Sequence, residues 1–397
     1  MKHITADSPY ISVLRLLSYC GEFHPSLIKM LPMKYNTVMK LIKRSMNKSK
    51  YQDEMGNYYG DLALYKIVGQ GEQKSIMLTR EAEESKILDI VDGTEFYELY
   101  NKTALQHNNE IRRRRNHYLG EIVTALNQVG VSVFPQAKFS PGLVFQPSDS
   151  NLTLRENMNV FYSNREIKFY TGSEIRALDV NIKFGSYYGL WFCRGRPYVL
   201  YHPNKNKAVW NFSSEGRTVL MLTEFLKYTI DQGVPLPKIT RAVFIGKGKS
   251  TPLMMLRKED ERPFILGRPF LSNYYVPVEH YKDVLSVIQF KNYDEIMKKI
   301  CFGKTPPIET FTVECHGITS NSEYLMAVFD FDLSRLRRFK LAMDVFKNSK
   351  FVIVCFPWMV EIIREYFGQR LIIKTISAER LLPAMKRVEN TRNGITK

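Results

Sequence analysis

The sequence contains no run of 18 or more consecutive apolar residues, so it predicts no membrane-spanning helix. Residues 1–23 carry polar side chains where a secretory signal peptide needs an unbroken apolar stretch. We therefore expect a cytoplasmic protein that does not associate with a membrane.

Cysteine is scarce, and its spacing suits neither disulfides nor a metal site. The chain has five cysteines, and no two of them form a C-x-x-C pair. An odd number of widely spaced cysteines in apolar surroundings is typical of reduced, buried thiols. We interpret in this way Cys20, Cys193, Cys301, Cys315 and Cys355.

Acidic residues are in deficit, with 40 Asp and Glu against 57 Lys and Arg, which gives a formal net charge of +17. The excess is spread over the whole chain, which argues against a neutral enzyme with one basic tail. A charge of this size predicts a polyanionic partner, either nucleic acid or a membrane surface.

The order of helix and strand signals predicts an α/β protein, α+β overall, in three domains. We expect a winged helix in residues 1–92, a mixed α/β domain of degenerate nuclease-like type in residues 93–235, and a C-terminal βαβ-type domain in residues 236–397. No fixed-period repeat is present, which argues against a solenoid.

The winged helix is predicted from three helical segments followed by a two-stranded hairpin. The helices begin after Ser8, near Leu27 and at Asn36 or Thr37, and the strands span residues 62–68 and 74–78. In helix-turn-helix proteins the recognition helix enters the major groove. We therefore expect the third helix to contact DNA.

Residues 34–50 contain basic side chains and no acidic one. Such a helix suits contacts with phosphates, while Asn and Thr side chains can reach base edges. The alternative is a solvated basic helix, or a winged helix that binds protein. The predicted DNA-binding residues of this segment are Lys34, Asn36, Thr37, Lys40, Lys43, Arg44, Asn47 and Lys48.

Two further basic clusters are predicted to hold the DNA backbone or the DNA of a partner. One is the run Arg112, Arg113, Arg114 and Arg115, which leads into a helix over residues 117–128 and is either a phosphate clamp or a solvated helix start. The other is a helix over residues 334–346, where we select Arg335 and Arg338.

The third domain alternates strands with helices. Apolar strands at 324–329, 351–356 and 371–376 flank two helices, which predicts a parallel sheet buried on both faces. A further strand is expected at 310–315. Asp330-x-Asp332 resembles a phosphatase magnesium motif, but the residues that should follow are missing, and we interpret Asp332 instead as the residue that begins the helix.

A magnesium nuclease of the restriction-enzyme type needs a helical acidic residue, an Asp and a Glu-x-Lys pair. The candidate catalytic residues are Glu121, Glu174 and Asp179, and no Glu-x-Lys follows on the next strand. We therefore favour a protein without its own catalysis. We expect no metal site and no cofactor, with Mg²⁺ required only if the nuclease alternative holds.

Aromatic and polar side chains alternate between Tyr162 and Arg217. Tyr162, Trp210 and Arg217 could stack on unpaired bases, or the block could be a strand-rich core with Glu–Arg pairs. Together with the winged helix at 8–90 and the arginine-rich helix at 112–126, this block resembles the replication-relaxation group of plasmid and integrative-element proteins. The resemblance implies a restriction-endonuclease-like domain and a role in plasmid replication or conjugative mobilisation.

We accordingly expect a DNA-binding protein of a mobile genetic element. One alternative is a magnesium-dependent DNA-nicking enzyme, and another is a scaffold protein that binds an acidic partner. Beside DNA, the expected partners are a relaxase or replication proteins and a second copy of the chain. No membrane partner is expected.

Overall fold

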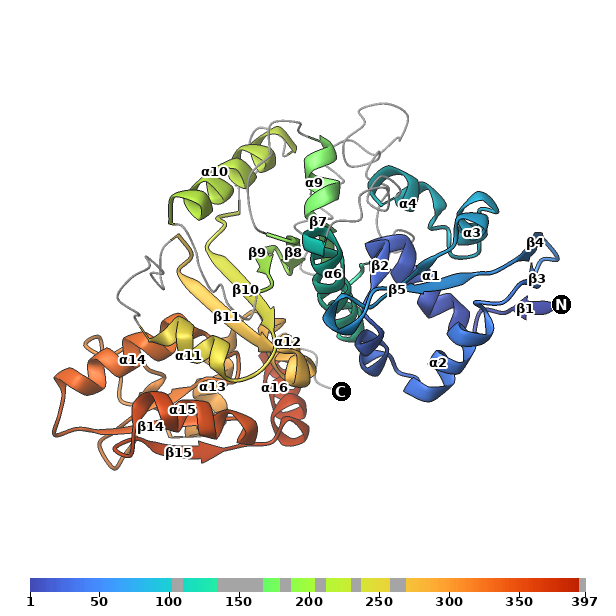
Figure 1. The fold of residues 1–397 in the computed structure, drawn as a ribbon. Helices are drawn as coiled ribbons and strands as arrows, with labels where there is room; N and C mark the ends of the chain where they lie inside the picture. The colour runs from blue at the N-terminus through green and yellow to red at the C-terminus, as the bar shows by residue number, and fades with distance from the viewer. Residues whose placement is uncertain are drawn as a thin grey trace. The chain divides into compact units, whose positions relative to one another are not determined.

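The computed structural model describes residues 1–101, 110–133, 167–178, 187–203, 212–229, 237–257, 269–303 and 305–392 (Figure 1). Helices and small mixed sheets alternate along the chain, so the protein is α/β, as the sequence predicts. The chain divides into two compact units. Unit 1 comprises residues 1–157 and 167–180, and unit 2 comprises residues 158–166 and 181–397. None of the described helices is long and apolar enough to cross a membrane.

Unit 1 begins with short strands and helices and continues into a long helix. In chain order its elements are β1 (Lys2–Ile4), α1 (Pro9–Cys20), β2 (Glu22–Phe23), η1 (Pro25–Met30), α2 (Tyr35–Arg44), β3 (Ser49–Asp53), β4 (Tyr58–Leu62), β5 (Tyr65–Val68), η2 (Gly71–Gln73), β6 (Ser75–Leu78), α3 (Arg80–Glu84), η3 (Ile87–Val91), α4 (Thr94–Tyr100), α6 (Glu110–Gln128), β7 (Ile167–Thr171) and α9 (Gly172–Leu178).

The elements α1, β2, η1, α2, β5 and β6 follow the order of a winged helix. Strands β2, β6 and β5 form an antiparallel sheet in the order β2-β6-β5, and the β5–β6 turn is the wing. The second predicted helix is a short 3-10 helix. It begins at Pro25, and His24 caps it by accepting a hydrogen bond from the backbone N–H of Ser26.

A second hairpin, formed by β3 and β4, lies between α2 and the wing, and the sequence does not predict it. It pairs with β1 in the order β1-β3-β4. The strand expected at 62–68 is confirmed only as β5, because the chain leaves β4 at Leu62 and enters β5 at Tyr65. Leu64 lies in the connection between β4 and β5 and donates its N–H to Ser45 O at 2.8 Å. The polar sequence of β3 lacks the apolar alternation that identifies a strand.

Unit 2 contains two sheets and the helices that cover them. Its elements are β8 (Gly189–Cys193), β9 (Arg196–Tyr201), α10 (Phe212–Thr229), β10 (Arg241–Gly246), α11 (Ser250–Leu256), β11 (Ser272–Pro277), η5 (Val278–His280), α12 (Tyr281–Ile288), α13 (Tyr293–Phe302), β12 (Gly317–Ile318), β13 (Glu323–Ala327), α14 (Leu333–Val345), β14 (Lys350–Cys355), η6 (Pro357–Met359), α15 (Val360–Phe367), β15 (Ile372–Thr375) and α16 (Ala378–Arg392).

The first sheet of unit 2 contains β11, β10, β9 and β8 in that order. β8 and β9 form an antiparallel hairpin, whereas β9, β10 and β11 run parallel. β9 and β10 lie on either side of the domain boundary expected at 235, yet they pair directly. The alternative interpretation of this region, a strand-rich core, fits the burial of Trp191, Tyr198 and Tyr201.

The second sheet has the order β12-β13-β14-β15, with β13, β14 and β15 parallel. Its β13-α14-β14-α15-β15 connection is the one predicted from the apolar runs. Strand β14 is buried throughout except for its first residue, Lys350. The strand expected at 310–315 is wrong. Val313 of that segment is buried, but Phe311 is fully exposed, and the segment pairs with no strand among the described residues.

The cysteines have the state predicted from their spacing. All five are free thiols. Cys20, Cys193 and Cys355 are buried, while Cys301 and Cys315 are partly exposed. Burial raises the pKa of Cys193 to about 11 and that of Cys355 to about 12, which keeps both thiols protonated at neutral pH.

Candidate nucleic-acid interface

Helix α2 turns a narrow apolar side inward and a basic side outward. Val38 and Ile42, four residues apart, are fully buried against the core of unit 1. The helix ends at Ser45, a buried residue whose hydroxyl lies 2.9 Å from Tyr10 Oη. The carbonyl of Ser45 accepts the N–H of Leu64, so the end of α2 is tied to the hairpin region.

The structure leaves every predicted DNA-binding residue of this segment exposed to solvent. This exposed set, called here the α2 basic face, consists of Lys34, Asn36, Thr37, Lys40, Lys43, Arg44, Asn47 and Lys48. Lys50, on β3, is exposed as well. The sequence from residue 29 to residue 50 contains no acidic side chain, so the charge of the face is of one sign.

One member of the α2 basic face has an acidic partner. Lys48 Nζ lies 3.0 Å from Glu81 Oε1, where Glu81 belongs to α3. The hydrogen bond from Lys48 holds the pKa of Glu81 below its usual value. Both side chains remain about half exposed or more, so the pair is accessible to competing ions.

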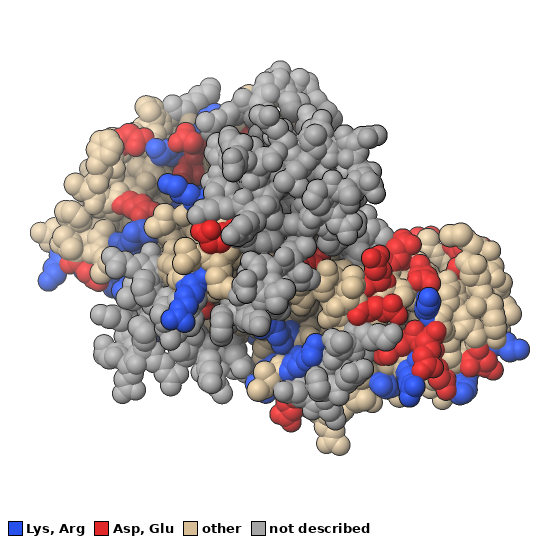
Figure 2. All heavy atoms as spheres, turned by 90° about the horizontal axis from the view of Figure 1, so that it is seen from above, with Lys and Arg blue, Asp and Glu red and all other residues tan. Residues whose placement is uncertain are grey.

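Acidic side chains gather elsewhere on unit 1. Between residues 80 and 100 the chain has the exposed acids Glu81, Glu84, Asp89, Asp92, Glu95 and Glu98. In Figure 2 several red side chains lie on the described part of unit 1, with blue side chains between them. Among the described residues of unit 1, the α2 basic face suits a polyanion, whereas residues 80–100 expose these acids beside Arg80 and Lys86.

The wing is a tight turn that requires glycine at its first position. Gly69 has a φ of +73°, and a Cβ there would lie 2.3 Å from the carbonyl oxygen of Gln73. A ring nitrogen of His24, Nε2, lies 3.2 Å from Gly71 O. The turn is thus held against the segment that leads into η1.

Helix α6 contacts the winged helix through the arginine run. Arg113 Nε donates to Glu22 Oε2 at 3.2 Å, and Asn116 Nδ2 donates to Glu22 Oε1 at 3.3 Å. The side chains of Arg113 and Glu22 are only 14% and 7% exposed. His117, one turn further along, forms a short hydrogen bond with Ser75 Oγ on β6.

The prediction of a four-arginine phosphate clamp therefore needs a correction at Arg113. This guanidinium neutralises a buried carboxylate within the protein and is not presented to a ligand. Arg112, Arg114 and Arg115 are half-buried, and burial lowers the pKa of Arg112. The sequence could not identify Glu22 as the partner, because the two residues are 91 positions apart.

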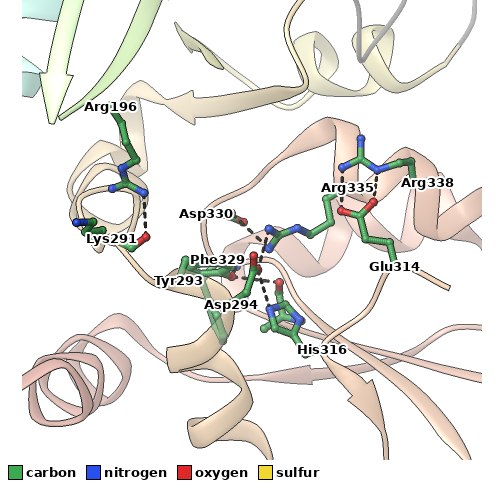
Figure 3. A network of polar contacts seen from close by, with 11 residues as sticks. Arg196, Lys291, Tyr293, Asp294, Glu314, His316, Phe329, Asp330, Arg335 and Arg338 are labelled. Carbon is green, nitrogen blue, oxygen red and sulfur yellow. Dashed lines mark hydrogen bonds and ion pairs between the residues drawn. The ribbon is translucent and has the colours of Figure 1, made fainter. Parts of the chain in front are cut away.

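Arg335 also needs a correction, because it belongs to a buried polar network in unit 2 (Figure 3). Arg335 Nη2 lies 2.9 Å from Asp294 Oδ1, and Nη1 lies 3.6 Å from Asp330 Oδ2. Its side chain is 13% exposed and lies over the ring of Tyr293. Arg338 is more exposed but forms an ion pair with Glu314. Arg335 is therefore not available for DNA in the way predicted, whereas Arg338 stays a prediction, because its ion pair is exposed and accessible to competing ions.

The network in Figure 3 connects the loop after β13 with α13. His316 Nε2 lies 3.3 Å from Asp294 Oδ1, and His316 Nδ1 accepts the N–H of Ala327. Partial burial opposes the shift, but His316 and Arg335 together lower the pKa of Asp294 to about 2. Burial raises the pKa of Asp330 to about 7, against the attraction of Arg335.

Asp332 begins helix α14, which confirms the second of the two interpretations given to the Asp-x-Asp motif. Its Oδ1 accepts the N–H of Ser334 at 2.9 Å and the N–H of Asn273 at 3.0 Å. Asp330 and Asp332 are 3% and 1% exposed. Both carboxylates therefore serve the fold.

The structure describes two of the three candidate nuclease residues. Glu121 and Glu174 are both buried. Glu174 accepts the N–H of Thr171 at 2.6 Å and the hydroxyl of Tyr19 at 3.2 Å, so it stabilises the start of α9. Asp179 lies outside the described residues, as do Tyr162 and Trp210. Within the described part of the chain, no three His, Cys, Asp or Glu side chains are grouped to hold a metal ion.

Comparison with known proteins gives no relative for this chain. No family model matches it. No curated protein and no solved structure matches it significantly. The function of the protein must therefore be argued from its own residues.

Proposed function

We propose that the protein binds duplex DNA through the α2 basic face. The observation that supports this most directly is the exposure of all eight selected side chains along residues 34–48, which comprise α2 and the turn after it and contain no acid. Five of them are cations, and phosphate contacts supply most of the affinity of DNA-binding proteins. Asn36, Thr37 and Asn47 are exposed beside them and supply the groups that read base edges.

The surroundings of α2 support the same proposal. In a winged helix the recognition helix enters the major groove while the wing lies close to the neighbouring backbone. Here the wing is fixed by Gly69 and by the contact of His24 with Gly71. Lys74 is exposed at the end of this turn and adds a cation to it.

In the cell, we propose that this binding acts in the cytoplasm, in plasmid replication or conjugative mobilisation, without catalysis by the protein itself. The support for this wider role is the resemblance of the sequence to the replication-relaxation group. A relaxase or a replication protein would then be the protein partner.

The test is the salt dependence of DNA affinity in a variant of α2. Lys43→Ala with Arg44→Ala removes two exposed cations from the last turn of α2. We expect the slope of log K against log salt to fall by about two, and affinity at 0.1 M salt to fall by about ten- to one hundred-fold. Fluorescence anisotropy with a labelled random 30-bp duplex measures both.

The control is Arg380→Ala with Lys386→Ala, two exposed cations on α16 of unit 2. It removes the same charge from the chain, so it shows the effect of net charge alone. If the slope of log K against log salt were the same in the α2 and α16 variants, the α2 basic face would not be part of the DNA interface.

A further inference from the structure

A second basic surface lies on unit 2, at the amino-terminal end of the parallel sheet. Residues 337–374 contain eight Lys and Arg residues and only three acids, Asp344, Glu361 and Glu365. Three of the cations lie in the loops before β14 and β15 or at the start of β14, and a fourth lies in the last turn of α15. We call this group the sheet-end surface, and it consists of Lys347, Lys350, Arg364 and Arg370.

The pairing of the strands brings these residues together. In the parallel register of β14 and β15, Val352 is opposite Ile372. Lys350 lies two residues before Val352, and Arg370 lies two residues before Ile372, so both cations lie at the same end of the two strands. Arg370 Nη2 donates to the carbonyl of Lys347 at 2.6 Å, which joins the two loops. Arg364 Nη1 donates to Gln369 Oε1 at 2.8 Å, so this guanidinium is held beside the turn before β15.

Three nearby acids already pair with other cations, and a fourth, Glu323, lies opposite Lys350 in the register of β13 and β14 and accepts a hydrogen bond from Thr319 Oγ1 at 3.3 Å. Asp344 pairs with Lys340 at 3.3 Å, and Glu365 pairs with Arg257 at 2.7 Å. Glu361 pairs with Lys249 of the loop before α11. All four members of the sheet-end surface are exposed, and the ion pairs found among the described residues include none of them.

We propose that the sheet-end surface binds the phosphate backbone of nucleic acid. Uncompensated cations on adjacent rigid elements hold counterions that phosphates replace, and this exchange drives binding. A guanidinium donates in a planar fork that matches phosphate oxygens, and two of the four residues are arginines. The hydrogen bonds of Arg364 and Arg370 to neutral acceptors fix their position without consuming their charge.

This surface belongs to unit 2, whereas the α2 basic face belongs to unit 1. The inference is therefore independent of the proposed role of α2. If both surfaces bind, one chain contacts nucleic acid at two places, and the overall affinity exceeds that of either surface alone.

The test uses the full-length chain with Lys347→Ala and Lys350→Ala, which removes two exposed side chains and no hydrogen bond to a side chain. A second variant, Lys350→Ala with Arg370→Ala, removes the guanidinium as well. The probe is a labelled random 30-bp duplex, titrated at several KCl concentrations. We expect the salt slope to fall by about two in each variant, and to stay unchanged in the Arg380→Ala, Lys386→Ala control.

The same substitutions in a Lys43→Ala, Arg44→Ala background separate this proposal from the function proposed for α2. If only the sheet-end substitutions lower the salt slope, the result supports the sheet-end surface and contradicts the function proposed for the α2 basic face. If only the α2 substitutions lower it, the result overturns the proposal for the sheet-end surface. A further arm uses vesicles with 30% phosphatidylserine. If the sheet-end variants lose binding to these vesicles while their DNA binding is unchanged, the partner of this surface is a membrane, and the proposal of a nucleic-acid partner is overturned.

Discussion

Arg113 and Glu22 form an ion pair whose two side chains are almost entirely withdrawn from solvent. Arg113 lies on α6, and Glu22 lies on the short strand β2 of the winged helix. Asn116 completes the hydrogen bonding of the same carboxylate. The pair connects α6 to the three-stranded sheet that supports the wing, so it belongs to the scaffold of the interface.

This arrangement predicts different effects for two neighbouring arginines. Arg113→Ala leaves the carboxylate of Glu22 buried without its cation, so we expect the free energy of unfolding to fall by about 3 kcal/mol. The DNA salt slope should not change. Urea unfolding and anisotropy titrations measure the two quantities.

Arg114→Ala is the matched control, because Arg114 is half-buried and has no acidic partner within the described residues. We expect its unfolding free energy to stay within about 0.5 kcal/mol of the native protein. If Arg113→Ala instead lowered the salt slope with stability intact, Arg113 would contact phosphate and would not belong to the scaffold of the interface.

The ion pair between Lys48 and Glu81 predicts that α3 restrains DNA binding. Glu81 competes with phosphate for Lys48, so Glu81→Gln should raise affinity by about two- to five-fold at 0.1 M salt. Glu84→Gln removes the same charge from the same helix, and its partner is Arg80 rather than Lys48. An equal rise in both variants would show that only the net charge matters. Anisotropy titration checks this.

The two carboxyls of the unit 2 network predict opposite responses to pH. Asp330 has a folded-state pKa of about 7, above its ordinary value of 3.8. The folded protein therefore binds more protons than the unfolded chain between these values, and stability falls as pH rises from about 4 to about 7. For Asp294, whose pKa is lowered to about 2, stability is lost as pH falls from about 4 towards 2.

Asp330→Asn should therefore flatten the decline in unfolding free energy between pH 4 and pH 7. Chemical unfolding at a series of pH values measures this slope. Asp344→Asn, on the same helix region but exposed, is the control. A slope unchanged in Asp330→Asn would show that Asp330 titrates in the folded protein as it does in the unfolded chain.

The wing predicts unequal costs for two glycine substitutions. Gly69→Ala places a Cβ within 2.3 Å of a backbone carbonyl at a left-handed φ, so the turn must move. We expect a loss of about 2–3 kcal/mol of stability and weaker DNA binding. Gly71 is also left-handed, but a Cβ there meets nothing within 4 Å, so Gly71→Ala should cost only about 1 kcal/mol. Similar losses in both variants would contradict a clash at Gly69.

The periodic parts of the fold were predictable from the sequence, and their partners were not. The spacing of Val38 and Ile42 and the continuous apolar runs of β13 and β14 identify elements from local pattern alone. The β3–β4 hairpin was not predicted because its residues are polar. The strand predicted around Phe311 was wrong because Thr, Phe and Val favour strands only where they can pair with a sheet.

The sequence by itself determined the basic character of the protein, the order of the winged-helix elements and the exposed cations of α2. Only the tertiary structure decided which cations remain available to a ligand. Arg113 and Arg335 are sequestered by Glu22 and Asp294, which come from distant parts of the chain. Lys347 and Arg370 are brought together by parallel strand pairing. The physical reason is that a charge is neutralised by whichever group lies within a few ångströms, and such proximity across many residues is a property of the fold.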